Sequence, residues 1–405
     1  MNFLDKVFSG KPSRPDFTEM MMQAFQQAGI ETTDQSESDF SLKLASGGTV
    51  FLGNVYTMFC GAPRAKRQSI VSEFLAAAAS ISGLSSIPTD FATIRPSLMP
   101  VLSDAVYFSL IQLMQRKNGK QDVAQEDLVK PIAGGLQIGL AYDSERNITT
   151  LDREHFKSWG VSLDEAFKAA KENLWEKTDP TKFGGGNGVY HGAWADSYDS
   201  SRMLLTELIY RLSVDGDPVV FVPNRDQFWI TGTNNSAGLA ALLKGGMESH
   251  FKQDHPLSPD LYALVDGTWK VHIPGDPALR ELWMKIKRQR DAIDYAQQQK
   301  LLNEIYELED IDIFVASYKV YERKDGLAYS ACVWTDGVDS SLPRSENIAL
   351  MADVENPEYF VVPWEATESV IGDMLELEPN LVPVRYRARQ FPSEDQLAKL
   401  RPLAL

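Results

Sequence analysis

The sequence predicts an α+β fold, with antiparallel sheets built from strand–strand–helix units and a smaller α+β C-terminal lobe after a long helix. Three observations predict it. The order strand, strand, helix occurs three times, with short turns between the strands and no visible repetition of residues. Consecutive strands joined by short turns pair antiparallel, and helices then cover one face of the sheet. Beyond Asp276 the composition shifts to a long polar helix followed by two further hairpins.

Composition and charge exclude several classes of protein. The chain has 405 residues, 43% of them hydrophobic and 24% charged, with a formal net charge of −16. These proportions are typical of globular proteins and exclude collagen-like chains, wholesale disorder and disulfide scaffolds. An acidic surplus disfavours binding to nucleic acid and to anionic membranes, because both require clustered Lys and Arg. We therefore expect neither a nucleic acid nor a membrane among the partners.

The cysteines and the first residues predict a cytoplasmic location. Cys60 and Cys332 both lie in apolar surroundings, which favours two free, buried and reduced thiols, with a disulfide between them as the alternative. A catalytic role is a further alternative for Cys60, because Arg64 and a helix start follow it closely. The segment that begins Met1-Asn2-Phe3 lacks the apolar core of a secretory signal.

Changes in composition divide the chain into four predicted segments. Residues 1–15 are predicted as a loose arm and 16–130 as an N-terminal α+β lobe. Residues 131–275 are predicted as a central α+β lobe, and 276–405 as the long helix with the C-terminal α+β lobe.

The first strand–strand–helix unit follows an N-terminal helix. Apolar residues at helical spacing predict a helix over 17–28, whose methionine-rich face we interpret as core. Strands are predicted over 40–44 and 49–59, and a helix over 63–80 with its proline in the first turn. The basic residues early in this last helix are interpreted as a solvated face: Arg64, Lys66 and Arg67.

Two more units follow in the central segment. The second has predicted strands over 136–142 and 148–151, joined by a turn over 144–147, and a helix that Ser162 and Glu165 open as a capping box. The third is predicted in three pieces: strands over 219–222 and 227–231, and a helix over 236–251.

The long helix begins at a clear signal. Asp276 is a typical N-cap and Pro277 suits the first helical position, so a helix is predicted to about Leu308, or to a break near Asp294. Its basic residues are again interpreted as a solvated face: Lys285, Lys287, Arg288 and Arg290.

Two hairpins and a short helix are predicted in the C-terminal lobe. The first hairpin joins 312–321 to 327–334 around Asp325-Gly326, and the second joins 347–354 to 359–362 around Asn356-Pro357. A capping box then opens a last short helix, with Ser393 and Gln396 as its members.

Familiar catalytic and cofactor motifs are missing from the sequence. We find no HExxH, no GxSxG, no P-loop and no GxGxxG after a strand, so no cofactor is expected and no metal ligands are assigned. The five histidines form no close pair at helical spacing. The carboxylates over 307–312 are interpreted as a solvated acidic run at a helix end.

A glycine-rich segment is the first candidate ligand site. Residues 184–188, which include Asn187, are predicted as a loop that leads into a strand and then into a helix over 200–212. Such a loop can let an anionic ligand approach backbone N–H groups, and Arg202 can add a bidentate contact. The structural alternative is that Asp199 or Ser197 caps the helix and Arg202 pairs locally.

The second candidate is the turn between the strands of the third unit. Arg225 and Asp226 lie in the segment Val222-Pro223-Asn224-Arg225-Asp226 and could join Asp199 and Arg202 in one polar cluster. The alternative is that these side chains satisfy backbone groups of the turn.

These two segments carry a family resemblance. Asp196-Ser197-Tyr198-Asp199-Ser200-Ser201-Arg202, followed by the Val222–Asp226 segment, resembles the YtpQ-like family of uncharacterised bacterial proteins. Ile94-Arg95-Pro96 resembles a strand of that family with an Ile-Arg pair, and residues 140–174 resemble its strand–strand–helix unit ending in Asn-Leu. The similarity covers roughly residues 40–270. It implies a cytosolic bacterial protein with an α+β fold and no transferable activity, and it nominates five polar positions: Tyr198, Asp199, Arg202, Arg225 and Asp226.

Three function classes follow from these observations, and the third is a structural subunit that self-associates through the long helix from Pro277. The leading hypothesis is a non-catalytic binding or protein-interaction protein that meets a protein partner through the C-terminal lobe, where Trp334, Tyr359, Phe360 and Trp364 form either a partner surface or core. The alternative is an enzyme or binding protein for a small phosphorylated or carboxylated molecule. In that hypothesis the 184–188 loop and Arg202 hold the anion, and Asp199 or Asp226 acts as a base.

Overall fold

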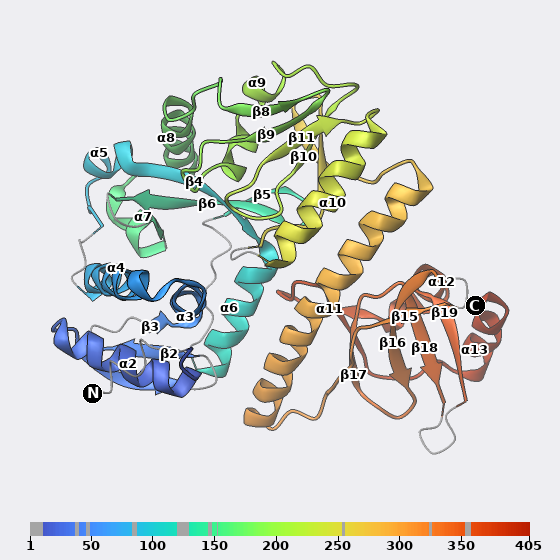
Figure 1. Cartoon of the computed structure of the whole chain (residues 1–405). Coiled ribbons are helices and arrows are strands. Elements are labelled where there is room, and N and C mark those ends of the chain that lie inside the picture. Colours follow the sequence, from blue (N-terminus) through green and yellow to red (C-terminus); the bar gives the residue numbers. More distant parts are fainter. Residues whose placement is uncertain are drawn as a thin grey trace. The chain divides into compact units, whose positions relative to one another are not determined.

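Helices and mostly antiparallel sheets build the chain, which confirms the predicted α+β class (Figure 1). The structure is a computed structural model that describes residues 11–36, 40–45, 49–82, 87–119, 129–144, 148–151, 153–252, 256–323, 326–352 and 358–405. The chain divides into two compact units, Met1–Leu98 with Ala141–Val161 and Met99–Leu140 with Ser162–Leu405. The predicted division into four segments stays a prediction.

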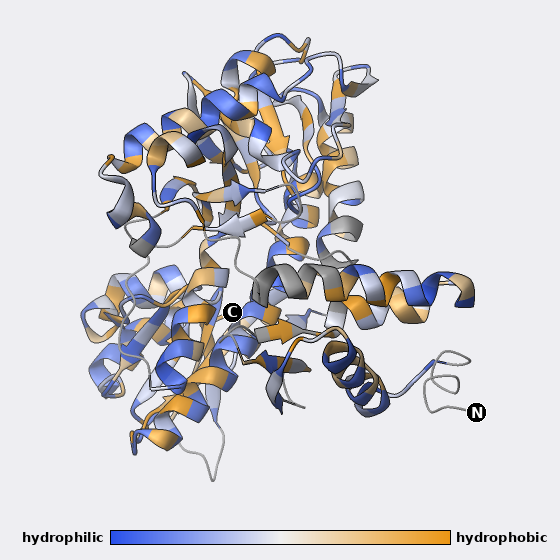
Figure 2. Cartoon of the chain, turned by 90° about the vertical axis from the view of Figure 1, so that its left-hand side faces the viewer, coloured by the Kyte–Doolittle hydropathy of each residue, from blue (hydrophilic) through white to orange (hydrophobic). Residues whose placement is uncertain are grey.

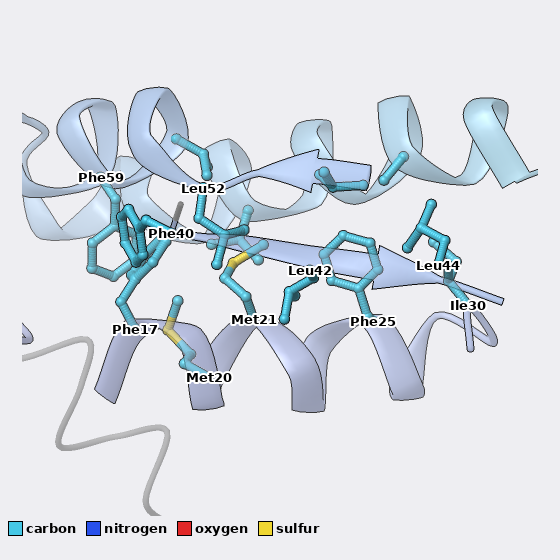
Figure 3. Close-up of a cluster of buried hydrophobic side chains, with 14 residues drawn as sticks. Phe17, Met20, Met21, Phe25, Ile30, Phe40, Leu42, Leu44, Leu52 and Phe59 are labelled. Atoms are coloured by element: carbon cyan, nitrogen blue, oxygen red, sulfur yellow. The ribbon is translucent and has the colours of Figure 1, made fainter. Parts of the chain in front are cut away.

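The first unit has a core between helix α2 and a three-stranded sheet. Figure 3 shows Met21 and Phe25 of α2 beside Leu42 of β2, and Phe17 of α2 beside Phe40 and Phe59. The side chains of Phe17, Met21, Phe25 and Leu42 are fully buried. This confirms that the methionine-rich face is core. Its elements are α2 (Arg14–Gln27), β1 (Thr32–Ser36), β2 (Ser41–Leu44), β3 (Thr49–Phe51), α3 (Gly53–Gly61), α4 (Arg64–Ser82), α5 (Phe91–Ile94), the 3-10 helix η1 (Arg95–Ser97), β7 (Ile148–Thr150) and α7 (Arg153–Trp159).

Two strand predictions in this unit are wrong. The strand expected over 49–59 ends at Phe51, and α3 follows from Gly53. The segment is rich in aromatic and β-branched residues, but Val55 and Phe59 are buried at i and i+4 while Met58 is 58% exposed, a helical pattern. Residues 94–96 are also helical instead of a strand, because Asp90 caps α5 and η1 continues it to the start of β4.

The second unit contains a six-stranded antiparallel sheet in the order β13–β12–β10–β11–β9–β8. Helices α10 and α11 pack on this sheet through an apolar cluster that includes Phe221, Leu243 and Trp283. The elements before α11 are β4 (Leu98–Asp104), α6 (Ala105–Lys117), β5 (Lys130–Ala133), β6 (Leu136–Asp143), α8 (Leu163–Glu176), β8 (Phe183–Gly186), β9 (Val189–Gly192), the 3-10 helix η3 (Ser200–Leu204), α9 (Thr206–Ile209), β10 (Pro218–Phe221), β11 (Trp229–Gly232), α10 (Ser236–Lys252), β12 (Leu261–Val265) and β13 (Thr268–His272).

Helix α11 (Pro277–Leu308) is unbroken, so the predicted N-terminus is confirmed and the alternative of a break near Asp294 is wrong. The Asp276 carboxylate accepts a hydrogen bond of 2.9 Å from the N–H of Leu279, as an N-cap does. In Figure 1, α11 lies between α10 and the strand-rich C-terminal lobe. It contacts this lobe through hydrogen bonds, since Tyr295 donates to the Val384 carbonyl and Gln298 donates to the Pro383 carbonyl, both at 2.8 Å. An apolar cluster also joins Leu302 and Ile305 of α11 to Val315.

The C-terminal lobe holds two four-stranded sheets, β14–β17–β21–β20 and β15–β16–β18–β19, with parallel pairs β14–β17 and β16–β18. Both predicted hairpins form, as β15–β16 and β18–β19, and the Ser393–Gln396 capping box is present. The elements are β14 (Phe314–Val315), β15 (Lys319–Glu322), β16 (Ala328–Thr335), β17 (Ser340–Pro343), β18 (Asn347–Met351), β19 (Tyr359–Pro363), α12 (Trp364–Ile371), η4 (Gly372–Met374), β20 (Glu376–Leu377), β21 (Arg385–Ala388), α13 (Glu394–Leu400) and η5 (Arg401–Leu403).

Several predicted features fall outside the described residues. These are residues 1–10 of the predicted arm, most of the turn over 144–147, Asp325, Asn356 and Pro357. The rest of the predicted arm is partly helical, because α2 begins at Arg14. Both cysteines are free, but only Cys332 is buried, so the prediction of a buried thiol is wrong for the partly exposed Cys60. Burial raises the pKa of the Cys332 thiol to about 11. Ribbons in Figure 2 are banded in hydrophobic and hydrophilic residues, as expected for helices with one buried face.

Candidate functional site

The segment between β9 and η3 is a strained loop, and hydrogen bonds to the buried Asp199 carboxylate stabilise it. Ala195 and Ser197 have φ values of 53° and 68°, in the left-handed region that residues with a Cβ rarely adopt. Asp199 is 1% exposed and accepts hydrogen bonds from the N–H groups of Trp194 and Ala195, at 3.2 and 3.0 Å. Burial raises the pKa of Asp199, against these bonds. Asp199 therefore stabilises the loop and caps no helix with its side chain.

Arg202 is fully buried and its guanidinium is surrounded by partners. Nη1 and Nη2 donate to the two Asp196 oxygens at 2.9 and 2.6 Å, and Nε donates to the Thr178 hydroxyl at 3.0 Å. The Trp194 ring lies 4.2 Å from the guanidinium carbon. Burial would raise the pKa of Asp196, but the bonds from Arg202 hold it below its usual value. The bidentate contact predicted for a ligand is thus made to a residue of the same loop.

The predicted helix over 200–212 is wrong. The chain forms η3, then breaks at Leu205, where φ is −90° and ψ is 66°, and continues as the short α9. Neither η3 nor α9 has a side-chain N-cap, and the Asp199 carboxylate, which the sequence offers as a cap, accepts from the N–H groups of Trp194 and Ala195 instead.

The structure brings the two predicted segments together through the backbone. The N–H of Ser200 donates to the carbonyl of Arg225 at 3.2 Å. Tyr198 is 2% exposed and belongs to the core, whereas the Arg225 and Asp226 side chains are 27% and 52% exposed. Asp226 Oδ1 lies 3.8 Å from Arg225 Nε, a distant ion pair. Only Arg225 and Asp226 among the nominated residues of these segments therefore present charge to solvent.

Asn187 does not join this cluster, and the predicted glycine loop is a hairpin. Residues 183–186 form β8, which pairs with β9 from Phe183 opposite Gly192 to Gly186 opposite Val189. Asn187 and Gly188, with φ of 55° and 74°, make the two-residue turn, which requires positive φ at both positions. Gly192 lies at the other end of this hairpin, where a Cβ would come within 2.8 Å of Asp199 Oδ1. The 184–188 segment is therefore part of a β-hairpin, with Gly185 at a φ of 100°, instead of the predicted loop.

A second polar cluster, which sequence reasoning missed, lies along α11. Lys287 Nζ contacts Asp260 at 3.2 Å, and Arg290 contacts Asp294 at 2.6 Å and Asp104 at 3.3 Å. These carboxylates come from the end of β4, the segment before β12 and α11 itself. We call the following residues the α11 ionic cluster: Asp104, His250, Asp260, Lys287, Arg290, Asp291 and Asp294.

His250 is a neutral member of this cluster with one defined tautomer. Its Nδ1 lies 2.9 Å from the Pro223 carbonyl, which can only accept, so Nδ1 carries the hydrogen. Its Nε2, 3.3 Å from Arg290 Nη1, must then be the acceptor. Burial lowers the pKa of His250 to about 4.

Three carboxyls of the cluster hold protons unusually firmly. Burial raises the pKa values of Asp104, Asp291 and Asp294 to about 6, against the attraction of Lys287 and Arg290. A pKa raised on folding contributes stability below the unfolded value and loses it as pH rises through the folded value, here near 6. His250 contributes to the pH dependence of stability with the opposite sign. The unfolded chain protonates this residue below about pH 6.5, so its contribution destabilises the fold as the pH falls. A general acid must also reach a substrate, and the Asp104 and Asp294 side chains are only 6% and 5% exposed.

The interpretation of the basic residues on α11 as a solvated face is wrong for most of them. Arg288 is 6% exposed and ion-pairs with Glu281 and Glu346, and Arg290 lies in the cluster; only Lys285 of the predicted four is exposed. Arg67 on α4 is likewise 9% exposed. One sequence signal could have found the cluster: positions 287, 290, 291 and 294 form a single charged stripe at helical spacing.

The C-terminal lobe has a surface hollow of about 370 Å³. Tyr359, 63% exposed, stands at it, and the Arg401 guanidinium lies 5.3 Å above the Phe360 ring. Trp334 and Trp364, offered as surface or core by the sequence, are fully buried core. The hollow is lined by Leu350, Ala352, Glu358, Tyr359, Phe360, Phe391, Leu397 and Arg401.

Comparisons with models of protein families, with curated proteins and with solved structures give no match. Within the described ranges, no helix combines the length and the apolar character needed to cross a bilayer. In the same part of the chain, no three His, Cys, Asp or Glu side chains are arranged to hold a metal ion.

Proposed function

We propose that this chain is a non-catalytic, cytoplasmic protein-interaction protein of the YtpQ-like family, and that its C-terminal lobe carries the partner surface. The observation that carries the proposal is the distribution of exposed apolar side chains. Of the 17 large hydrophobic side chains recorded as exposed in the described part of the chain, nine lie beyond residue 310. Protein partners preferentially cover such surface. The nine are Phe314, Val320, Tyr321, Leu327, Tyr359, Leu377, Val384, Leu403 and Leu405.

The attachment of this lobe to α11 supports a role as a rigid display platform. Arg385 is fully buried and donates to Gln298 of α11 at 2.6 Å and to the carbonyls of Ala316 and Ser341 at 3.1 and 3.0 Å. Buried hydrogen bonds of this kind fix one arrangement of helix and sheet. A surface held in this way loses little conformational freedom when a partner docks.

The alternative, a site for a small anionic molecule, has less support. It needs Arg202 and the 184–188 segment to meet the ligand, whereas Arg202 has no exposed surface and residues 183–186 pair with β9. Arg225 and Asp226 remain accessible, but they stand as one separated pair on a turn. A single exposed pair of this kind is more typical of an ordinary surface than of a catalytic site.

The proposal is tested by affinity capture with the full chain and two matched surface variants. Tyr359→Ser changes the 63% exposed side chain at the hollow, and Ile273→Ser changes a 55% exposed side chain outside the lobe. We expect a specific partner to be retained by the wild type and by Ile273→Ser, and to be lost or weakened at least tenfold in Tyr359→Ser. Equal retention by all three proteins would place the partner surface elsewhere and contradict the proposal.

A further inference from the structure

We infer that the free edge of β15 accepts an extended strand from a partner, and that this strand has acidic residues on either side of an apolar or aromatic one. The inference rests on the proposed function and adds to it a docking mode and a partner chemistry. In the four-stranded sheet, β15 is the outermost strand and β16 is its neighbour. All four residues of β15 are exposed, Val320 and Tyr321 by 41% and 42%.

The two edges of this sheet differ. At the β19 edge the chain closes on itself, because the N–H of Leu405 donates to the carbonyl of Val361 at 2.9 Å. At the β15 edge, the described residues supply no further strand. Helix α11 approaches β15 and the residue before it, where Tyr318 stacks on Tyr295 at 5.0 Å, but all four residues of β15 stay exposed. An exposed edge strand of this kind is the template on which strand addition occurs.

The register shows which backbone groups point outward. The N–H of Arg323 donates to the carbonyl of Leu327, so this pair is hydrogen-bonded, as is every second pair along an antiparallel ladder. Val320 and Ser330 therefore form a non-bonded pair, and the N–H of Ser330 indeed donates to Glu346 instead. It follows that the N–H and C=O groups of Val320 and Glu322 face the open edge.

The side chains on the edge select the charge of the incoming strand. Arg323 lies over the Tyr329 ring at 5.4 Å and Tyr321 stacks on the same ring at 5.5 Å, so both share one face of the sheet with Lys319. No ion pair is recorded for Lys319 or Arg323 within the described ranges. A strand that pairs antiparallel with β15 places every second residue opposite Arg323, Tyr321 and Lys319 in turn. These three positions favour an acidic, an apolar and an acidic residue.

A second copy of this chain fits the edge less well. If two copies of β15 pair antiparallel about a two-fold axis, residues directly opposite each other have side chains on the same face of the sheet. Odd-numbered residues then stand opposite odd-numbered ones, and even-numbered opposite even-numbered. The register centred on Tyr321 places Lys319 opposite Arg323 of the partner copy, two like charges. The register centred on Val320 places Lys319 opposite Tyr321 and leaves the cations without a carboxylate. A partner with its own acidic residues satisfies the edge better.

The test uses the full chain and a fluorescent peptide, Thr-Glu-Thr-Phe-Val-Glu-Thr, with a control in which both Glu are Lys. We expect the acidic peptide to bind at least tenfold more tightly than the control. Binding should slow hydrogen exchange at the N–H groups of Val320 and Glu322, which have no strand partner in the free protein. Absence of binding at millimolar peptide, or binding without this protection, would overturn the inference.

Two variants separate edge docking from other modes. Val320→Pro removes an outward N–H but no bond of the β15–β16 ladder, a position where edge strands tolerate proline, and should weaken the acidic peptide at least tenfold. Val320→Thr keeps the N–H and should bind as the wild type does. Joint reversal by Lys319→Glu and Arg323→Glu should transfer the preference to the lysine peptide, a result that does not depend on the fold of the proline variant.

The remaining outcomes are decisive as well. If Val320→Pro binds the peptide normally, or if sedimentation shows a self-association that Val320→Pro abolishes, the inferred acidic strand is wrong. If the captured partner depends on Tyr359 and not on Val320, the C-terminal lobe still serves as the interaction surface. In that case the proposed function survives and edge docking fails.

Discussion

Replacement of Arg202 by methionine separates a structural role from a ligand-binding role for the 196–202 segment. Methionine keeps much of the volume and removes the charge. The change breaks the two bonds to Asp196, the bond to Thr178 and the contact with the Trp194 ring. We expect Arg202→Met to lower the free energy of unfolding substantially while leaving any small-anion binding unchanged.

The magnitude follows from the partners. Removing one member of a buried ion pair destabilises by about 3–5 kcal/mol, and the low end applies because the Asp196 side chain is 32% exposed and can rehydrate. Loss of the Thr178 bond adds about 1 kcal/mol. Loss of the cation–π contact adds about 0.5–1 kcal/mol. The expected total is about 4 kcal/mol, allowing for overlap among these contributions.

The assay is urea unfolding followed by circular dichroism, with Arg225→Met as the matched control. Arg225 is 27% exposed and lies 3.8 Å from its carboxylate, so we expect its replacement to change stability by less than about 1 kcal/mol. A double-mutant cycle with Asp196→Asn isolates the pair. If Arg202→Met changes stability by less than about 1 kcal/mol, the buried pair is not what stabilises the loop, and the reasoning is refuted.

Three further predictions follow from other parts of the molecule. Lowering the pH from 8 to 5 should stabilise the fold through the three raised carboxyls of the α11 ionic cluster and destabilise it through His250, so His250→Gln should gain more stability than the wild type over this range; an equal or smaller gain in urea unfolding would contradict it. Gly246→Ala should destabilise by about 1–3 kcal/mol in thermal unfolding, because a Cβ there would stand 1.7 Å from the Phe221 ring, whereas Gly245→Ala, with open space around it, should stabilise by about 0.5–1 kcal/mol. A thiol reagent should leave Cys332 unmodified in the folded protein, and modification at the rate of the unfolded chain would show that its burial is wrong.

Local signals in the sequence predict much of this fold. The N-cap at Asp276, the capping box at Ser393 and the third strand–strand–helix unit are confirmed, because each depends on residues close together in the chain. The failures arise where local patterns are ambiguous or are overridden by distant contacts. The strand expected over 49–59 contains residues that suit a strand or a buried helix equally, and tertiary packing decides for α3.

The candidate site was less accessible to sequence reasoning. The sequence allows either a ligand contact or a local ion pair for Arg202, and only the loop geometry shows that its partner is Asp196. In the α11 ionic cluster Asp104 contacts Arg290, although the two residues lie far apart in the sequence and no motif links them. A charged helix stripe alone predicts solvent exposure more often than burial, which is why the prediction of a solvated face fails for most of the basic residues on α11.

A thermal-shift screen of the full chain against nucleotides, sugar phosphates, small carboxylates and divalent metals tests the central claim most directly. That claim is that the motif around Arg202 stabilises the fold and that the interaction surface lies on the C-terminal lobe. A ligand at one hundred times its Kd would stabilise the folded state by about 2.7 kcal/mol, a shift that is readily measured. The account predicts no shift with any of these compounds. A shift that disappears in Arg225→Ala or Asp226→Ala would place a small-molecule site at the β10–β11 turn and contradict it.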